Sequence, residues 1–277
     1  MGMRVSTNVA SINAQRSMAG AQRDIQKSFA QLSSGSRITK AADDAAGLSI
    51  SESLKSSGRS YQQAIRNSND GISMIQVAEG GLNEISNIMV RLRELGIQAS
   101  SDTVGERERG FINGEVQQLV SEADRISKTT QYSGTNLLDG TGKTLDFQVG
   151  IFNDDKLDRI SYDASNTDAT VASLGIDDID FSSKQGAQKA LQVIDEAQLR
   201  ANSYRSNLGA LQNRLTSTVD NLNVSFENIT AANSRIRDTD LAQASADLTK
   251  NNILLNASVG TLAQANSAPQ LALKLIG

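Results

Sequence analysis

The stretch IQVAEGGLNEISNIMVRL, residues 75–92, decides the fold, because its apolar residues recur every seven positions. The repeat forms two adjacent rows, which are Ile75, Leu82 and Met89, and Ala78, Ile85 and Leu92. Such a repeat is typical of helices that pack along a narrow seam in a coiled coil. We therefore expect a helix over most of residues 45–100, which would be roughly 80 Å long at 1.5 Å per residue.

Gly80 and Gly81 interrupt this pattern at a cost of about 1 kcal/mol each relative to alanine. They mark either a break in the helix or a place where another backbone comes close. We favour close packing.

Both ends of the chain carry apolar stripes of the same kind. Toward the C-terminus, two series at sevenfold spacing are Ile194, Ala201, Leu208, Leu215, Leu222, Ile229 and Ile236, and then Leu241, Leu248, Leu255 and Leu262. From Val5, the N-terminal stripe contains Val9, Ile12, Met18, Ala21, Ile25, Phe29 and Leu32. A single narrow stripe does not stabilise a long helix alone. We therefore expect the terminal helices to pack against each other and against neighbouring molecules.

The middle of the chain breaks the helical pattern. Residues 132–183 are rich in Gly, Asp and Asn, and the segments LDFQV and LDRISY alternate apolar and polar residues on either side of FNDDK. This pattern predicts a β-hairpin with surface loops, one of which is DASNTDAT at 163–170. A shorter helix is expected near Glu115 to Thr129.

These segments predict a mainly α fold: an elongated helical bundle, or coiled-coil rod, with paired N- and C-terminal helices and a small β-hairpin insert. The predicted domains are a terminal coiled-coil domain of residues 1–44 and 236–277 and a core helical domain of residues 45–235. The core domain would contain the hairpin and loop region at about 132–183.

Composition argues against most enzymatic and polyanion-binding roles. The 277 residues include no cysteine and no histidine, so thiolate nucleophiles, soft metal sites and the usual neutral-pH general base are missing. The net charge of -4 gives no positive field to attract nucleic acid or anionic lipid. No apolar run resembles a cleaved signal or a membrane span. We expect no catalytic residue, cofactor, metal, nucleic acid or membrane partner, and a protein that stays inside the cell or leaves it without a cleaved signal.

GTGKT at 140–144 suggests a phosphate-binding loop, but Leu137 stands where the motif needs glycine. The segment also approaches the predicted hairpin and no helix is expected to follow it. Nucleotide binding is therefore disfavoured.

The segment LSSGSRITKAADDAAGLSISES, residues 32–53, predicts a joint between two helices rather than a catalytic site. Gly35 and its serines supply a turn. Asp43 and Asp44 precede the next helical run, where free backbone N–H groups and the helix dipole favour negative charge. Arg37 and Lys40 are free to meet acidic groups on another helix or another subunit.

Several ordered motifs make the chain resemble bacterial flagellin. They are STNVASINAQRSM at 6–18, LSSGSRITKAADDAAGLSIS at 32–51, RLRELGIQAS at 91–100, DRISKTTQYSGTNLLDG at 124–140, LGALQNRL at 208–215, SRIRDTDLAQASADLTKNNIL from 234 and LAQANSAPQLALKLIG at the end. The match covers both ends and most of the chain. It resembles a compact flagellin that keeps the terminal and core helical domains and lacks large outer domains.

The resemblance implies a structural subunit that polymerises into the helical filament of the bacterial flagellum, for motility. An open helical assembly agrees with helices that need neighbouring molecules. In the family, the terminal segments order on assembly. The candidate assembly residues are Ile12, Ile25, Phe29, Leu32, Arg37, Lys40, Asp43, Asp44, Leu241, Leu248, Leu255 and Leu262.

The resemblance also implies partners and a location. Family members are exported unfolded through the flagellar type III apparatus to the extracellular filament, and an export chaperone binds the C-terminal helix, here roughly Leu241 to Ile276. Hook-associated junction and cap proteins contact the filament. In some relatives a host Toll-like receptor reads the core domain. By motif this contact carries to Arg91, Leu95, Gln98 and Glu115, whereas Leu119 stands where such relatives have an arginine.

The sequence leaves two alternatives to the filament subunit. A junction protein of the hook and filament would assemble only as a short ring or layer, and the end motifs fit flagellin better. An enzyme carried on the filament would need an H-E-x-x-H helix, which a chain without histidine does not supply.

Overall fold

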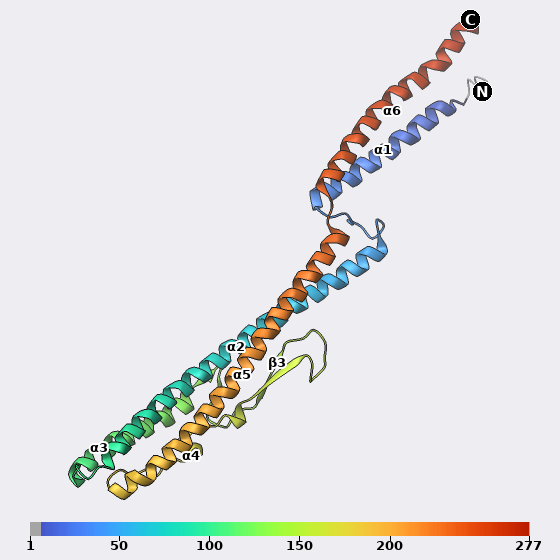
Figure 1. The fold of residues 1–277 in the computed structure, drawn as a ribbon. Coiled ribbons are helices and arrows are strands. Elements are labelled where there is room, and N and C mark those ends of the chain that lie inside the picture. Colours follow the sequence, from blue (N-terminus) through green and yellow to red (C-terminus); the bar gives the residue numbers. More distant parts are fainter. Residues whose placement is uncertain (1–6, 277) are drawn as a thin grey trace. The chain divides into compact units, whose positions relative to one another are not determined.

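The computed structural model describes residues 7–276, and side chains within residues 7–267. Val5, the predicted start of the N-terminal stripe, lies outside the described residues, as do the side chains of 268–276 in the expected chaperone segment. The helices are α1 (Val9–Ser34), α2 (Ala45–Ala99), α3 (Glu106–Thr129), α4 (Val171–Leu174), α5 (Lys184–Arg237) and α6 (Leu241–Ile276) (Figure 1). The strands are β1 (Gln131–Tyr132), β2 (Thr135–Asn136), β3 (Thr144–Gln148) and β4 (Arg159–Asp163), followed by a 3₁₀ turn, η1 (Ala164–Asn166). The mainly α fold is confirmed.

The chain divides into two compact units. The first holds the described residues up to Gly58 and from Asn228 onward, and the second is Arg59–Glu227. The predicted division at 44/45 and 235/236 stays a prediction.

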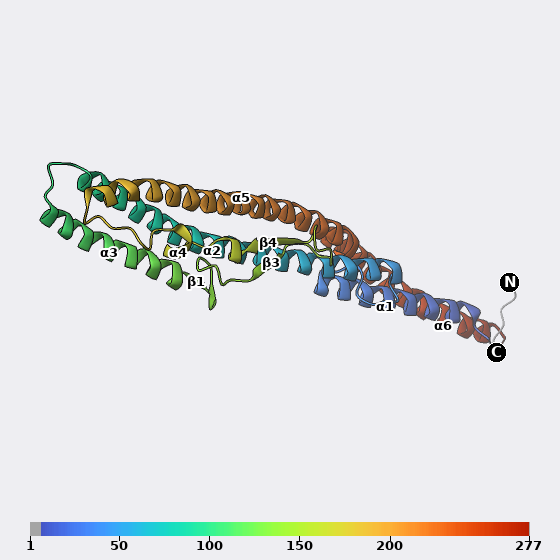
Figure 2. The same cartoon turned by 90° about the horizontal axis from the view of Figure 1, so that it is seen from below.

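The core of the second unit is the seam expected from the sevenfold repeat. All six residues of the two predicted rows in 75–92 are fully buried. On α5, the predicted positions Ile194, Ala201, Leu208 and Leu215 are also buried. Figure 2 shows α2 and α5 running side by side with α3 along them, so three helices enclose one apolar seam.

The two glycines of α2 have different environments. The helix runs through both of them without a break. A Cβ added at Gly81 would lie 2.6 Å from Thr130 Oγ1 and 2.8 Å from Leu138 Cδ1, whereas one added at Gly80 would meet nothing within 4 Å. Close packing is therefore correct for Gly81 and wrong for Gly80.

Helix α3 begins at Glu106, well before the predicted start near Glu115. Glu106 and Glu108 lie in its first turn, where the helix dipole stabilises negative charge. The buried Arg109 donates to the carbonyls of Ala99 and Ser101 at 2.8 and 2.9 Å, so it satisfies acceptors at the end of α2.

The predicted hairpin is confirmed. Strands β3 and β4 pair antiparallel, with Phe147 opposite Ile160 and Gln148 opposite Arg159. The hairpin lies on α2, because a Cβ at Gly71 would be 3.0 Å from the Phe147 ring and Asn67 Nδ2 donates to the Gln148 carbonyl at 3.0 Å. The GTGKT segment leads into β3 instead of a helix.

Residues 163–170 are not the surface loop that their polar composition suggested. Ala164, Thr167 and Ala169 are buried, and the Ala169 N–H donates to the Leu138 carbonyl at 2.9 Å. The segment forms η1 and packs on the core, so the expectation of a surface loop is wrong here.

Among the described residues, no helix combines the length and apolar character needed to span a membrane. The same residues contain no group of three or more acidic side chains arranged to hold a metal ion.

Candidate functional site

Helices α1 and α6 form an antiparallel pair in the first unit. At one end, Asn8 Nδ2 donates to the Ala265 carbonyl at 2.7 Å, while the Asn8 side-chain oxygen caps α1 by accepting from the Ser11 N–H. At the other end, the Thr239 N–H donates to the Gly35 carbonyl at 3.0 Å. Gly35 ends α1 in the left-handed conformation that the turn requires, with φ 67°.

The seam between α1 and α6 is lined by small or half-buried side chains. Its buried members are Ser11, Ala21 and Ser28 on α1 and Ala244 on α6, and its half-buried members include Met18, Ile25, Leu32, Leu248, Leu255 and Leu262. Small buried side chains remove little apolar area from water, so this seam gives the pair little stability. Of the candidate assembly residues, five thus lie in the seam within one chain.

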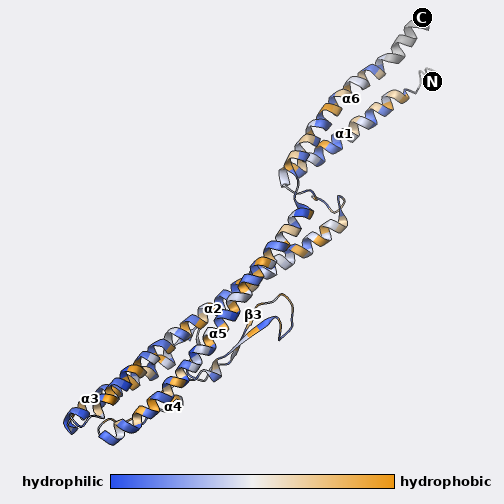
Figure 3. Cartoon of the chain, in the orientation of Figure 1, coloured by the Kyte–Doolittle hydropathy of each residue, from blue (hydrophilic) through white to orange (hydrophobic). Residues whose placement is uncertain are grey.

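Other apolar residues of the pair face solvent. They are Val9, Ile12 and Phe29 on α1 and Leu241, Ile253, Leu254 and Val259 on α6. Figure 3 shows apolar residues interspersed with polar ones along both helices. Clustered exposed apolar side chains mark interaction surfaces. The candidates Ile12, Phe29 and Leu241 belong to this outward set.

Arg37 holds the joint together through backbone groups. Its N–H donates to the Arg237 carbonyl at 2.6 Å, and its guanidinium donates to the Ile236 carbonyl at 3.2 Å from Nε and 2.7 Å from Nη2. A cation at the C-terminal end of a helix can donate hydrogen bonds to its free carbonyl groups, and it interacts favourably with the helix dipole. Arg37 therefore caps α5. Within this chain its guanidinium binds a backbone carbonyl and not the acidic side chain that we expected.

The two aspartates of the joint, Asp43 and Asp44, accept hydrogen bonds from different backbone groups. Asp44 caps α2 as predicted, because its side chain accepts from the Gly47 N–H at 2.8 Å. Asp43 instead accepts from the N–H groups of Thr39 and Lys40 and from the Thr39 hydroxyl, so it fixes the turn before the helix. Lys27 Nζ lies 3.5 Å from the Asp43 carboxylate.

The contacts of Asp43 change its titration. Hydrogen bonds from the Lys40 backbone and the Thr39 side chain favour the charged form and lower the pKa of Asp43 to about 2. The Lys40 ammonium itself has no ionic partner among the described residues.

Sequence reasoning missed two further ties of the joint. Arg237 Nη1 lies 2.5 Å from Glu52 Oε1, and Ser51 Oγ donates to Asn233 Oδ1 at 2.8 Å. Both join the first turns of α2 to the last turns of α5. Each polar pair has members about 180 residues apart in the chain, and local sequence patterns carry no signal for such pairings.

The four residues of the implied receptor contact are gathered on α2 and α3, but one of them is buried. Arg91 donates to Glu115 Oε1 at 2.7 Å and to Glu94 Oε2 at 3.2 Å, and these bonds, Glu115 first, raise the pKa of Arg91. Gln98 is exposed, whereas Leu95 is only 2% exposed. A partner on this face would touch the polar residues and not Leu95.

Comparison with known proteins assigns the chain to a family. Residues 5–143 match the model of the bacterial flagellin N-terminal helical region, and residues 191–276 match that of the C-terminal helical region. The chain is 44% identical over 274 residues to a flagellin of Halalkalibacterium halodurans, covering 99% of this chain and all of that one. It is 39% identical to a flagellin of Bacillus subtilis, over 99% of this chain and all of that one.

A solved structure agrees with this assignment. The crystal structure of Bacillus cereus flagellin is 27% identical, covers 57% of this chain and 88% of that one, and superimposes with a TM-score of 0.51. The structure of a hook-associated protein from Vibrio parahaemolyticus, at 13% identity and a TM-score of 0.54 over 71% of this chain and 100% of that one, shares the fold. The chain therefore belongs to the bacterial flagellin family and is a structural, non-enzymatic subunit of the flagellar filament.

Proposed function

We propose that the outward apolar residues of α1 and α6 form the contact between copies in the filament. The observation that carries this proposal is that the fully buried positions of the seam are small residues, whereas seven large apolar residues of the pair are left in solvent. Burial of apolar area on neighbouring copies would stabilise the pair by roughly 25 cal/mol per Å². Because the seam alone buries so little, the terminal helices gain most of their order on assembly.

Electron microscopy of the purified, polymerised chain tests this function. We expect long tubular filaments of one diameter. Short rings or layers would instead favour the junction-protein alternative. If concentrated protein gives no regular assembly under any polymerising condition, the proposed contact is wrong.

We also propose that an export chaperone binds α6 before assembly. The same apolar side chains that face solvent in one chain, Ile253 and Val259 among them, would be covered during export. Export of the chain to the extracellular filament is part of this proposal. A pull-down with the organism's chaperone should be lost on deleting 241–276 and kept on changing the exposed α2 residue Gly80 to alanine.

Hook-associated junction and cap proteins would contact the two ends of the filament. Such proteins share the paired-helix fold with this chain, as the Vibrio parahaemolyticus structure illustrates. The same outward faces of α1 and α6 could then serve both contacts. A filament-end binding assay with labelled junction protein should show binding to ends only and no binding along the sides.

A host Toll-like receptor would read Arg91, Gln98 and Glu115, with Leu95 supporting them from beneath. Leu119 stands where relatives that the receptor recognises have an arginine, so this chain lacks one positive charge at that position. We therefore expect it to activate the receptor more weakly than those relatives do. A receptor reporter assay with the dispersed chain measures this, and Leu119→Arg should raise the response. No increase with that variant would show that this face is not read.

A further inference from the structure

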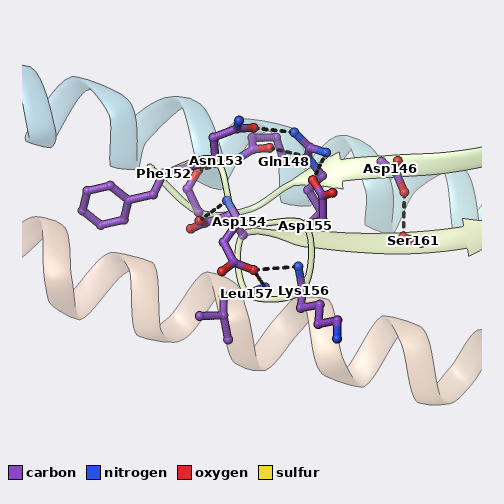
Figure 4. A network of polar contacts seen from close by, with 12 residues as sticks. Asp146, Gln148, Phe152, Asn153, Asp154, Asp155, Lys156, Leu157 and Ser161 are labelled. Atoms are coloured by element: carbon purple, nitrogen blue, oxygen red, sulfur yellow. Dashed lines mark hydrogen bonds and ion pairs between the residues drawn. The ribbon is translucent and has the colours of Figure 1, made fainter.

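The composition of this chain concentrates reaction with peroxides on methionine. Sulfur-containing side chains are the ones that peroxides oxidise most readily, and the chain has five methionines and no cysteine. Exposure without sulfur does not make such a site. Phe152 is 73% exposed and projects away from the strands of the hairpin (Figure 4), but its ring is pure hydrocarbon. Access to the methionines therefore decides where the chain reacts.

The methionines of the described residues differ in that access. Met74 and Met89 of α2 are 4% and 0% exposed, because they lie in the core of the second unit. Met18 of α1 is only half-buried, so part of it is open to a molecule as small as hydrogen peroxide. Met1 and Met3 lie outside the described residues. Among the described side chains, Met18 thus carries the accessible thioether.

Met18 belongs to the row of α1 that faces α6. It stands seven residues after the buried Ser11 and seven residues before the half-buried Ile25. Residues that recur every seven positions lie on one side of a helix in a coiled coil. The thioether of Met18 is therefore a seam group and not part of the outward apolar set.

The register of the pair places a leucine opposite Met18. The hydrogen bond from Asn8 to the Ala265 carbonyl fixes one end of the antiparallel pair. Met18 lies ten residues after Asn8, and Leu255 lies ten residues before Ala265. Both helices rise by about 1.5 Å per residue, so Met18 and Leu255 lie at the same level of the seam.

We propose that the Met18 thioether is a site of reversible oxidation by peroxides. A lone pair of the sulfur attacks one oxygen of hydrogen peroxide, and an S–O bond forms as the O–O bond breaks. The departing hydroxide takes the proton from the transferred oxygen and leaves as water. Sulfur loses two electrons and the peroxide gains them. The product is methionine sulfoxide, which methionine sulfoxide reductases convert back to methionine.

Oxidation would weaken the contact between α1 and α6. It turns a flexible apolar side chain into a polar one opposite Leu255, and burial of the sulfoxide oxygen without a hydrogen-bond donor costs free energy. The fully buried positions of the seam are small residues, so little apolar contact is left to compensate. This inference rests on the proposed filament contact, and it adds a modification that stops a dispersed chain from joining the filament.

Peptide mapping of the dispersed chain tests the site itself. Trypsin gives one peptide, 17–23, that contains Met18 as its only methionine, and another, 67–91, that contains Met74 and Met89. During mild treatment with hydrogen peroxide, mass spectrometry should show sulfoxide forming roughly tenfold faster in 17–23 than in 67–91, because reactivity follows exposure. Equal rates, or a slower rate in 17–23, would overturn the proposed site.

Polymerisation of treated chains tests the consequence, with Met18→Leu as the matched control. Leucine has nearly the volume of methionine and carries no sulfur. Peroxide should raise the critical concentration of the unchanged chain roughly tenfold or more, as expected for a buried polar group without a partner, and leave that of Met18→Leu unchanged. Met18→Gln, which is polar without oxidation, should assemble as poorly as the treated chain. An equal loss in treated Met18→Leu, or normal assembly of Met18→Gln, would overturn the inference.

Reversal of the damage separates the sulfoxide from other effects of peroxide. Incubation of the treated chain with methionine sulfoxide reductases and a dithiol should restore assembly, because these enzymes reduce methionine sulfoxide. Persistent loss of assembly would assign the effect to other damage and overturn the inference. An untreated chain that forms no filaments would instead overturn the proposed function, and the rates in the two peptides would still decide whether Met18 is the reactive site.

Discussion

The guanidinium of Arg37 donates two hydrogen bonds to the carbonyl of Ile236, a residue 199 positions away in the chain. The adjacent backbone pairs as well, because Ser36 and Asp238 form an antiparallel bridge. Arg37, which follows α1, thus caps the free carbonyl groups at the C-terminal end of α5. Order in the joint and order in the last turn of α5 depend on each other.

Replacing Arg37 with alanine should loosen the joint. A hydrogen bond to a charged group is worth about 1.5–3 kcal/mol, and solvent exposure of Arg37 reduces this to about 1 kcal/mol. Hydrogen exchange at the amides of Asp238 and Thr239 in the filament should therefore quicken about fivefold. Arg37→Lys should recover part of the protection, and Arg23→Ala on the exposed side of α1 serves as a control. Unchanged exchange in Arg37→Ala would contradict the capping role.

Asp43 should make the joint sensitive to acid. Its pKa falls from 3.8 to about 2 in the folded chain, so its carboxylate stabilises the fold above about pH 4, and this contribution is lost as pH falls through 2. We expect Asp43→Asn together with Asp44→Asn to weaken the filament at neutral pH and to flatten the pH dependence of sedimentable filament between pH 4 and 2. Asp24→Asn, an exposed change on α1, should leave that profile intact. A double variant with the unchanged profile would argue against this role.

Sequence periodicity predicted the parts of this fold that depend on one repeating pattern. The seam through Ile75 and Leu82 is buried as the sevenfold spacing required, and Asp44 caps α2 because capping depends on a few adjacent residues. Arg109 was missed, since a buried arginine at the start of α3 is satisfied by carbonyls of another helix. No local pattern announces that pairing.

Polarity misled the prediction at residues 163–170. Their Asp, Ser, Asn and Thr content suggested a surface loop, but Ala164 and Ala169 are buried, and Asp163 and Asp168 bond to neighbouring residues in the segment itself. Polar side chains that satisfy one another locally permit small neighbours to pack inward. In the outward set, Ile12, Phe29 and Leu241 were candidate assembly residues, whereas Ile253, Leu254 and Val259 were missed, because apolar residues on two faces of one helix look alike in a sequence.

Substitutions at three kinds of position on α6 test which of its faces is needed for polymerisation. Ile253 is 63% exposed, Leu255 is half-buried toward α1, and Asn252 is exposed and polar. Ile253→Asp should abolish sedimentable filaments by placing charge in the contact between copies, where an unpaired buried charge costs several kcal/mol. Leu255→Asp with Leu262→Asp should also abolish them, by separating α1 from α6, whereas Asn252→Asp should polymerise normally.

Thermal unfolding of the dispersed chain should stay unchanged in all these α6 variants, because the changes lie outside the core of the second unit. Normal polymerisation of Ile253→Asp would show that the outward face is not an interface. A lowered unfolding temperature for the Leu255 and Leu262 variant would show that α6 contributes to the stable core.

The adjacent glycines of α2 offer the sharpest test of core packing, because the same change should have opposite effects at the two positions. Gly80→Ala adds a methyl group in open space and removes backbone freedom from the unfolded chain, so it should raise the free energy of unfolding by about 0.5–1 kcal/mol.

At Gly81 the methyl group would press on the Thr130 hydroxyl and on Leu138. Neither neighbour moves easily, since the hydroxyl donates to the Ile126 carbonyl at 2.7 Å and Leu138 is fully buried. Overpacking costs about 1–3 kcal/mol and outweighs the helical gain, so Gly81→Ala should lower the unfolding temperature in calorimetry while Gly80→Ala raises it. Stabilisation by both changes would mean that α2 and the segment from Thr130 to Leu138 are not packed as described.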